Sequence, residues 1–112
     1  KRVLIMGMTF KENIKDTRNS KAFILKSAFE EFGIIVDTCD PVADNNDEIT
    51  FDYIPSHKIY DAVIIAVPHD QFISKHTQVI DEVLLDTGIL YDVKGIWKKE
   101  LGEIMDERYL TL

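Results

Sequence analysis

A phenylalanine and three cations occupy a loop in which many α/β domains bind phosphate. The stretch from Gly7 to Ser20 has the sequence GMTFKENIKDTRNS and follows the apolar run at residues 3–5. A dinucleotide-binding fingerprint would place three glycines in such a loop, so that backbone N–H groups could approach a pyrophosphate. Only Gly7 is present. An anion bound here would therefore be held mainly by side chains.

Lys11 and Arg18 are the candidate anion-binding residues of this loop. An Arg guanidinium offers two planar donors to a phosphate or carboxylate, whereas a Lys ammonium acts as a mobile point charge. Asp16 is spaced to hold Arg18, and Phe10 is either a core residue or a flat surface for a base or sugar. The alternative interpretation is a solvated loop whose cations serve solubility, and the residues alone leave both open.

Lys94 is the fourth candidate for substrate binding, because it follows another predicted strand and would reach the same crevice from the other side. An ordinary surface lysine is the alternative. No metal site is expected, since the three histidines lack His-x-x-x-His spacing and convincing third ligands. Cys39 lies in an apolar run and is expected to be a buried apolar residue, so no catalytic residue is predicted in this chain.

Alternating strands and helices are expected to position these residues. Strands are predicted at residues 3–5, 34–39, 61–67, 89–93 and 108–112, and helices at 20–32, 70–83 and 97–105. This order predicts an α/β fold with a doubly wound, mainly parallel sheet, a Rossmann-like three-layer α/β/α arrangement. The nearly continuous apolar run at 61–67 predicts the central strand. Ligands of such sheets bind beyond the carboxyl ends of the strands.

The first two predicted helices and the long connection after residue 39 have specific expected features. The first helix is expected to begin at an N-cap, Ser20, to stop at Gly33 and to pack one apolar face on the sheet: Ala22, Leu25, Ala28, Phe29 and Phe32. The second helix is expected to turn Phe72, Ile73, His76 or Thr77, and Ile80 inward. Residues 40–60 are expected to be a surface loop with a short extended piece near 51–54.

Length and charge limit the class of protein. The 112 residues fit one domain, without an apolar run of about 20 residues that could cross a bilayer. The net charge of −7 argues against a nucleic-acid-binding protein. Residues 1–30 nevertheless hold seven Lys/Arg against three Asp/Glu, so a small anion would be drawn to them. A single cysteine suggests the cytoplasm, and the absence of an initiator Met suggests a piece of a longer chain.

Four segments resemble, in order and spacing, the C-terminal UDP-binding domain of the UDP-glucose/GDP-mannose dehydrogenase family. They are VLIMGMTFKENIKDTRNSKAFIL at 3–25, VDTCDP at 36–41, YDAVIIAVPHDQF at 60–72 and LYDVKGIW at 90–97. The most specific pattern is G-x-[TS]-[FY]-K-x-x-x-x-D-x-R-x-S, which is met at Gly7, Thr9, Phe10, Lys11, Asp16, Arg18 and Ser20. The resemblance covers essentially the whole chain.

The resemblance implies that residues 1–112 are a single nucleotide-sugar-binding domain of a longer enzyme, a UDP-sugar 6-dehydrogenase that makes precursors of surface polysaccharides. In that family the sugar C6 alcohol is oxidised to a carboxylate with reduction of two NAD. The NAD and the catalytic cysteine belong to an N-terminal domain, so this chain alone is expected to be inactive and to need no cofactor. A homodimer of the full enzyme is also implied.

By the same resemblance, Phe10 and Lys11 correspond to a pair that contacts the nucleotide-sugar, and Lys94 stands where the family often has an Arg. The segment DVKGIW is more similar to the branch that acts on UDP-N-acetylhexosamines than to the UDP-glucose branch. The identity of the sugar stays open. The competing hypothesis is a non-catalytic sensor or assembly module that keeps the fold without the ligand.

Overall fold

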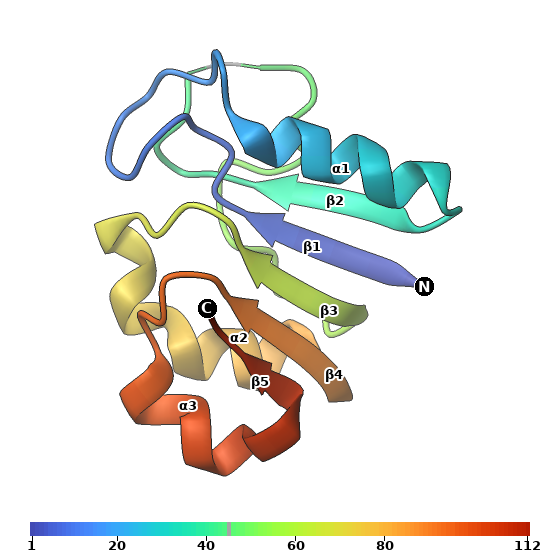
Figure 1. Cartoon of the computed structure of the whole chain (residues 1–112), viewed down its shortest axis with the longest axis vertical. Helices are drawn as coiled ribbons and strands as arrows, with labels where there is room; N and C mark the ends of the chain where they lie inside the picture. Colours follow the sequence, from blue (N-terminus) through green and yellow to red (C-terminus); the bar gives the residue numbers. More distant parts are fainter. Residues whose placement is uncertain (45) are drawn as a thin grey trace.

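Five parallel strands form one sheet in the computed structural model, which describes residues 1–44 and 46–112. The strands are β1 (Arg2–Met6), β2 (Ile35–Cys39), β3 (Tyr60–Ile65), β4 (Leu84–Asp92) and β5 (Tyr109–Leu110), in the spatial order β2-β1-β3-β4-β5. Their arrows point the same way in Figure 1, so all the loops that follow them lie at one edge of the sheet. The predicted parallel sheet with a central third strand is confirmed.

Helices cover the two faces of this sheet unequally. The helix α1 (Lys21–Glu31) lies on one face, and α2 (His76–Glu82) and α3 (Lys98–Met105) lie on the other (Figure 1). Alternating residues of β1 enter the two cores: Val3 and Ile5 pack with α1, whereas Leu4 and Met6 pack with the opposite layer. This is the period of two that a strand imposes, and it confirms the three-layer α/β/α prediction.

The first helix begins as predicted but buries less of its surface. The Ser20 hydroxyl accepts a hydrogen bond from the Ala22 N–H at 3.3 Å, as expected for an N-cap. Phe32 was expected on the sheet-facing side, but it is the C-cap residue and is 85% exposed. Ala28 is exposed as well. The helix ends at Glu31, one residue too early for Phe32 to continue the buried stripe.

The second predicted helix, 70–83, is divided in two. Residues Asp70–Lys75 form a 3₁₀ helix, η1, and the α-helix begins only at His76. The indole N–H of Trp97 donates to the carbonyls of Phe72 and Ile73 at 3.0 and 3.1 Å, which draws those carbonyls away from α-helical bonding. Ile73 was predicted to point inward and is instead 52% exposed.

Other inward positions of this segment and the later strands also differ from the prediction. Phe72 is buried as expected and His76 and Ile80 are half-buried, while the unpredicted Val79 and Val83 complete the core. The fourth strand starts at Leu84 rather than 89, because a bulge lets Tyr60 pair with Leu84 before Ala62 pairs with Ile89. The last strand pairs over only two residues. A short 3₁₀ helix, η2 (Asp106–Arg108), precedes it.

The connection from β2 to β3 is only partly the surface loop that was predicted. The Phe51 N–H donates to the carbonyl of Thr38, and the Asp40 N–H donates to the carbonyl of Phe51. These bonds form a parallel bridge between Cys39 and Phe51 beside β2. Phe51 and Ile54 pack on the core, and Pro55 is buried. The loop prediction at residue 45 lies outside the described residues. No helix in the described part of the chain has the length and apolar character to span a membrane.

Candidate functional site

The loop between β1 and α1 begins with a close approach of two backbones. Gly7 has φ +92°, and a Cβ built on it would lie 2.4 Å from the carbonyl oxygen of Val67. Its N–H donates to the carbonyl of Cys39 at 2.9 Å. The missing side chain thus permits close contact with the segment after β3, whereas a dinucleotide fingerprint uses glycine for contact with phosphate.

Arg18 and Asp16 form a bidentate ion pair near the far end of the same loop. Nη2 and Nε of Arg18 lie 2.8 and 3.0 Å from the two carboxylate oxygens of Asp16, and the backbone N–H of Arg18 also donates to Asp16 at 2.8 Å. The Arg18 side chain lowers the pKa of Asp16 to about 2. This is the pairing expected from the sequence. The Arg18 guanidinium stays on the surface, and the Asp16 carboxylate compensates its charge.

Phe10 and Lys94 line one groove of about 780 Å³, although they are far apart in the sequence. The groove lies between α1 and the carboxyl ends of β3 and β4, and its floor includes Ala66, Val67 and Val93. The ring of Phe10 is 60% exposed, so Phe10 is a surface residue, as the base- or sugar-packing alternative requires. An apolar floor beside an aromatic ring and a lysine suits a ligand with a planar group and a negative charge.

The predicted site residues thus separate into two groups. Phe10 and Lys94 share the groove, while Lys11 and Arg18 are not among its lining residues and lie on the exposed surface of the loop. In the described part of the chain, Lys11 and Lys94 make no ion pair, so both ammonium groups are available to an anion. The roles of the four residues stay predictions.

Asp92, a buried carboxylate at the end of β4, shapes the loop that carries Lys94. It accepts the backbone N–H groups of Ile96 at 3.0 Å and Trp97 at 2.7 Å, and the Tyr109 hydroxyl at 2.6 Å. Gly95, with φ +71°, completes this tight turn. Burial and the hydrogen bond to Asp92 raise the pKa of Tyr109, so its hydroxyl stays a donor. The Lys94 backbone is therefore fixed by bonds inside the domain.

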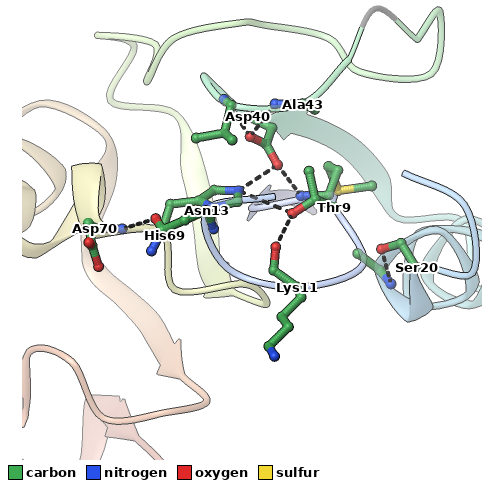
Figure 2. A network of polar contacts seen from close by, with 11 residues as sticks. Thr9, Lys11, Asn13, Ser20, Asp40, Ala43, His69 and Asp70 are labelled. Carbon is green, nitrogen blue, oxygen red and sulfur yellow. Dashed lines mark hydrogen bonds and ion pairs between the residues drawn. The ribbon is translucent and has the colours of Figure 1, made fainter. Parts of the chain in front are cut away.

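Asp40, a second buried carboxylate directly after β2, fixes the loop that carries Phe10 and Lys11. It accepts the N–H groups of Met8 at 2.6 Å, Val42 at 2.8 Å and Ala43 at 3.0 Å, and it lies 2.9 Å from Nε2 of His69. Figure 2 shows this network with the Lys11 side chain pointing away from it. Burial opposes ionisation, but the hydrogen bonds from His69 and the backbone outweigh it and lower the pKa of Asp40.

No function was predicted from the sequence for these supporting residues. Asp40 was placed in the family segment at 36–41 and at the start of a predicted loop, and the histidines were considered only as metal ligands. The signal that could have found them is positional: Asp40, His69 and Asp92 each stand at or just after the carboxyl end of a parallel strand. Side chains at that edge meet one another because the strands are parallel. No cluster of three potential metal ligands occurs among residues 1–44 and 46–112.

Comparison with known proteins gives the family. A model described as the UDP-glucose/GDP-mannose dehydrogenase family, UDP binding domain, matches residues 4–99. The chain belongs to this family. The chain is 35% identical over 108 residues to a UDP-N-acetyl-D-glucosamine 6-dehydrogenase of Pseudomonas aeruginosa, covering 92% of this chain and 26% of the relative. It is 36% identical over 99 residues to the protein CapL of Staphylococcus aureus, covering 84% and 23%.

A solved structure supports the fold of this UDP-glucose/GDP-mannose dehydrogenase domain. The UDP-N-acetyl-mannosamine dehydrogenase Cap5O from Staphylococcus aureus superposes with a TM-score of 0.75 at 21% identity, covering 98% of this chain and 25% of that one. The chain therefore spans about a quarter of the length of the relatives it matches. The Rossmann-like fold is confirmed, and the sequence resemblance to the family is correct.

The residues of this chain do not fit an NAD pyrophosphate site. The loop after β1 has Gly7 alone, and the space beside that glycine is filled by Val67. One N–H at the start of α1 is already bonded to the Ser20 hydroxyl. The loop after β1 therefore lacks both the glycines and the free space that a dinucleotide fingerprint provides for a pyrophosphate.

Proposed function

We propose that this chain is the nucleotide-sugar-binding domain of an NAD-dependent UDP-sugar 6-dehydrogenase, which oxidises the sugar C6 alcohol to a carboxylate for surface polysaccharide synthesis. The observation that carries the proposal is the convergence of Phe10 and Lys94 on one groove at the carboxyl edge of the sheet, within a chain of this family. Phe10 packs against the planar base or the sugar, and Lys94 with Lys11 compensates the diphosphate charge. Asp16 orients the Arg18 guanidinium through Nε and Nη2, and Nη1 of Arg18 remains as a hydrogen-bond donor to the ligand.

The relatives favour a UDP-N-acetylhexosamine as the substrate. Two of the three proteins described above are named for UDP-N-acetyl-D-glucosamine and UDP-N-acetyl-mannosamine. We further propose that an N-terminal domain of the same polypeptide binds NAD and supplies the catalytic cysteine, and that the intact protein is a cytoplasmic homodimer. Cys39 is fully buried, and burial raises the pKa of its thiol, so it is unsuited to act as the nucleophile.

A titration with UDP tests the binding role directly. We expect UDP to shift backbone NMR signals of Thr9–Lys11 and Val93–Gly95, at two loops of the same sheet edge, and GDP to shift them less. Signals at the opposite edge, such as Gly33 and Gly88, serve as internal controls and should stay unchanged. Shifts confined to that opposite edge would reject the site.

The enzymatic role is tested with the intact protein. UDP-N-acetylglucosamine and UDP-N-acetylmannosamine are each mixed with NAD, and the formation of NADH is followed by its absorbance. Two NADH per sugar are expected for oxidation of an alcohol to a carboxylate. A protein that binds UDP but reduces no NAD with any UDP-sugar would favour the sensor or assembly module.

A further inference from the structure

A buried histidine joins the three loops that follow β1, β2 and β3. The side chains of His69 and Asp40 are both 0% exposed, and His69 Nε2 lies 2.9 Å from Asp40 Oδ2. On the other side of the ring, His69 Nδ1 accepts the backbone N–H of Asn13 at 2.8 Å. Thr9 lies 3.4 Å from Nε2 and donates its hydroxyl hydrogen to the carbonyl of Lys11 at 2.8 Å. His69 therefore contacts both ends of the segment 9–13.

These contacts permit one protonation state of the ring. Nδ1 faces a backbone N–H, which can only donate, so Nδ1 must carry a lone pair. Nε2 faces a carboxylate, so it carries the hydrogen and donates to Asp40. The ring is thus the neutral Nε2–H tautomer, fixed by the partner of each nitrogen.

The anchored segment holds the candidate substrate residues between its two fixed ends. Thr9 is buried and Asn13 is bonded, while Phe10 and Lys11 between them are exposed. Asn13 has φ +64° and its side-chain oxygen accepts the Asp70 N–H at 2.9 Å, so this turn is held by two bonds to the segment after β3 (Figure 2). Phe10 and Lys11 thus lie between two residues that contact His69, while the buried His69 ring itself cannot reach a ligand.

A buried histidine with satisfied nitrogens more often stabilises a fold than serves a site. Here Asp40 is already satisfied by three backbone N–H groups without His69. The ring's other nitrogen is directed at the loop of Phe10 and Lys11, at the edge where the groove lies. This direction of the second bond favours a role in substrate binding.

We propose that His69, held as the Nε2–H tautomer between Asp40 and Asn13, is the positioning residue that sets Phe10 and Lys11 for binding of the UDP-sugar. The inference rests on the proposed function. His69 acts through the loop: it orders Phe10 and Lys11 before the ligand arrives, so the ligand does not have to order them on binding.

Two substitutions at position 69 separate the two bonds. His69→Asn places an amide oxygen near the position of Nδ1 and can keep the bond to Asn13, whereas His69→Gln places an amide nitrogen near Nε2 and can keep the bond to Asp40. In the intact protein we expect His69→Gln to raise the Kd for UDP about tenfold and to raise KM for the UDP-sugar by a similar factor. His69→Asn should keep the affinity for UDP within about threefold of the wild-type value. The control is His57→Gln, an exposed histidine, which should change neither value.

The tautomer is measured independently on the wild-type protein labelled with ¹⁵N-histidine. Long-range ¹H–¹⁵N correlation spectra should show protonated Nε2 and unprotonated Nδ1 for His69, and the reverse tautomer would overturn the inference even if both variants failed to fold. The inference would also be overturned if the wild type binds UDP and both variants fold and bind UDP as tightly as the wild type does. His69 would then be a stabilising residue only. A wild type that does not bind UDP would instead overturn the proposed function.

Discussion

The Tyr109 hydroxyl lies 2.6 Å from the Asp92 carboxylate and joins the last strand of the chain to the turn that carries Lys94. Asp92 is fully buried, and its two further bonds are to the backbone N–H groups of Ile96 and Trp97. Asp40 plays the corresponding part for the loop of Phe10. Two buried carboxylates thus shape the two loops from which the groove is built.

Tyr109→Phe removes one donor from Asp92 and keeps the ring. A hydrogen bond to a buried carboxylate is worth about 1.5–3 kcal/mol, and the free energy of unfolding should fall by about that amount. Urea denaturation measures the loss. Tyr53→Phe is the matched control, because Tyr53 is exposed, and it should change stability by less than about 0.5 kcal/mol. Equal stabilities of the two variants would mean that the bond to Asp92 adds nothing.

Gly7→Ala tests whether the first glycine of the family pattern is required by packing. The new Cβ would meet the Val67 carbonyl oxygen at 2.4 Å and the Val67 Cβ at 2.7 Å, and both belong to a buried segment that cannot shift freely. We expect a loss of about 3 kcal/mol or more, or no folded protein.

Gly33→Ala is the control for this substitution. Gly33 also has a positive φ, +79°, but nothing lies within 4 Å of its added Cβ. Only the left-handed backbone conformation is then penalised, by about 1–2 kcal/mol. Thermal melts of both variants give the comparison, and similar losses would show that conformation rather than contact with Val67 decides the cost at Gly7.

Asp40→Asn tests the buried carboxylate through pH. The pKa of Asp40 is lowered in the folded protein, so its ionised form stabilises the fold above the unfolded pKa of about 3.9. That contribution is lost as pH falls through the lower, folded pKa. We expect the variant to lose about 3 kcal/mol at pH 7, and the difference from wild type to shrink below about pH 4.

Urea denaturation at several pH values measures this difference. Asp81→Asn, an exposed carboxylate of α2, is the control and should differ from wild type by less than about 0.5 kcal/mol throughout. A deficit of Asp40→Asn that stays constant down to acid pH would contradict the ionised form of Asp40 as the source of stability.

The sequence predicted the sheet better than the helices, for a physical reason. Apart from Asp61 near its start, the strand at 60–65 is apolar on both faces, and such a run has few alternatives to a central parallel strand. Helix boundaries depend on contacts with residues distant in the sequence. The Trp97 indole N–H donates to the carbonyls of Phe72 and Ile73, and the local sequence at 70–83 does not predict these bonds. Phe32 fits the apolar spacing of the helix, but it is the C-cap residue and its side chain is exposed.

For the site, the sequence predicted candidate ligand-binding residues, but it did not predict the buried hydrogen bonds that hold their loops. Phe10, Lys11 and Lys94 were selected from their place after strands and from the family pattern. The bonds of Asp40 to Met8 and His69 span 32 and 29 residues. They follow from the order of the strands in the sheet, which brings β1, β2 and β3 together, and periodicity carries no information about such pairs.

Lys11→Ala in the intact enzyme tests the charge on the loop. If the ammonium meets the diphosphate or the reacting sugar, its loss removes a charge-assisted contact of about 1.5–3 kcal/mol, which is one to two decades in kcat/KM. The melting temperature should hardly change, since Lys11 is exposed. Lys15→Ala is the control, because Lys15 lies in the same loop and carries the same charge but does not occupy a position of the family pattern. Equal losses from both would indicate diffuse attraction instead of a contact.

Phe10 and Lys94 allow a test of whether the two sides of the groove act together on one ligand. Stacking of a base on an aromatic ring contributes about 1–3 kcal/mol, so Phe10→Ala should weaken UDP binding by about 5- to 150-fold in calorimetric titrations. Lys94→Ala removes a charged contact of similar size. Because both residues line one groove, the double variant should lose less than the sum of the two single losses.

Phe32→Ala is the control for the loss of an exposed phenylalanine. Phe32 is 85% exposed and caps the far end of α1, away from the groove, so its removal should leave UDP affinity unchanged. Phe10 is itself 60% exposed, and the stability of both variants should stay close to wild type. Strictly additive losses from Phe10→Ala and Lys94→Ala would indicate that the two residues act on the ligand independently. A normal affinity in Phe10→Ala would remove the ring from the site and leave binding to the lysines.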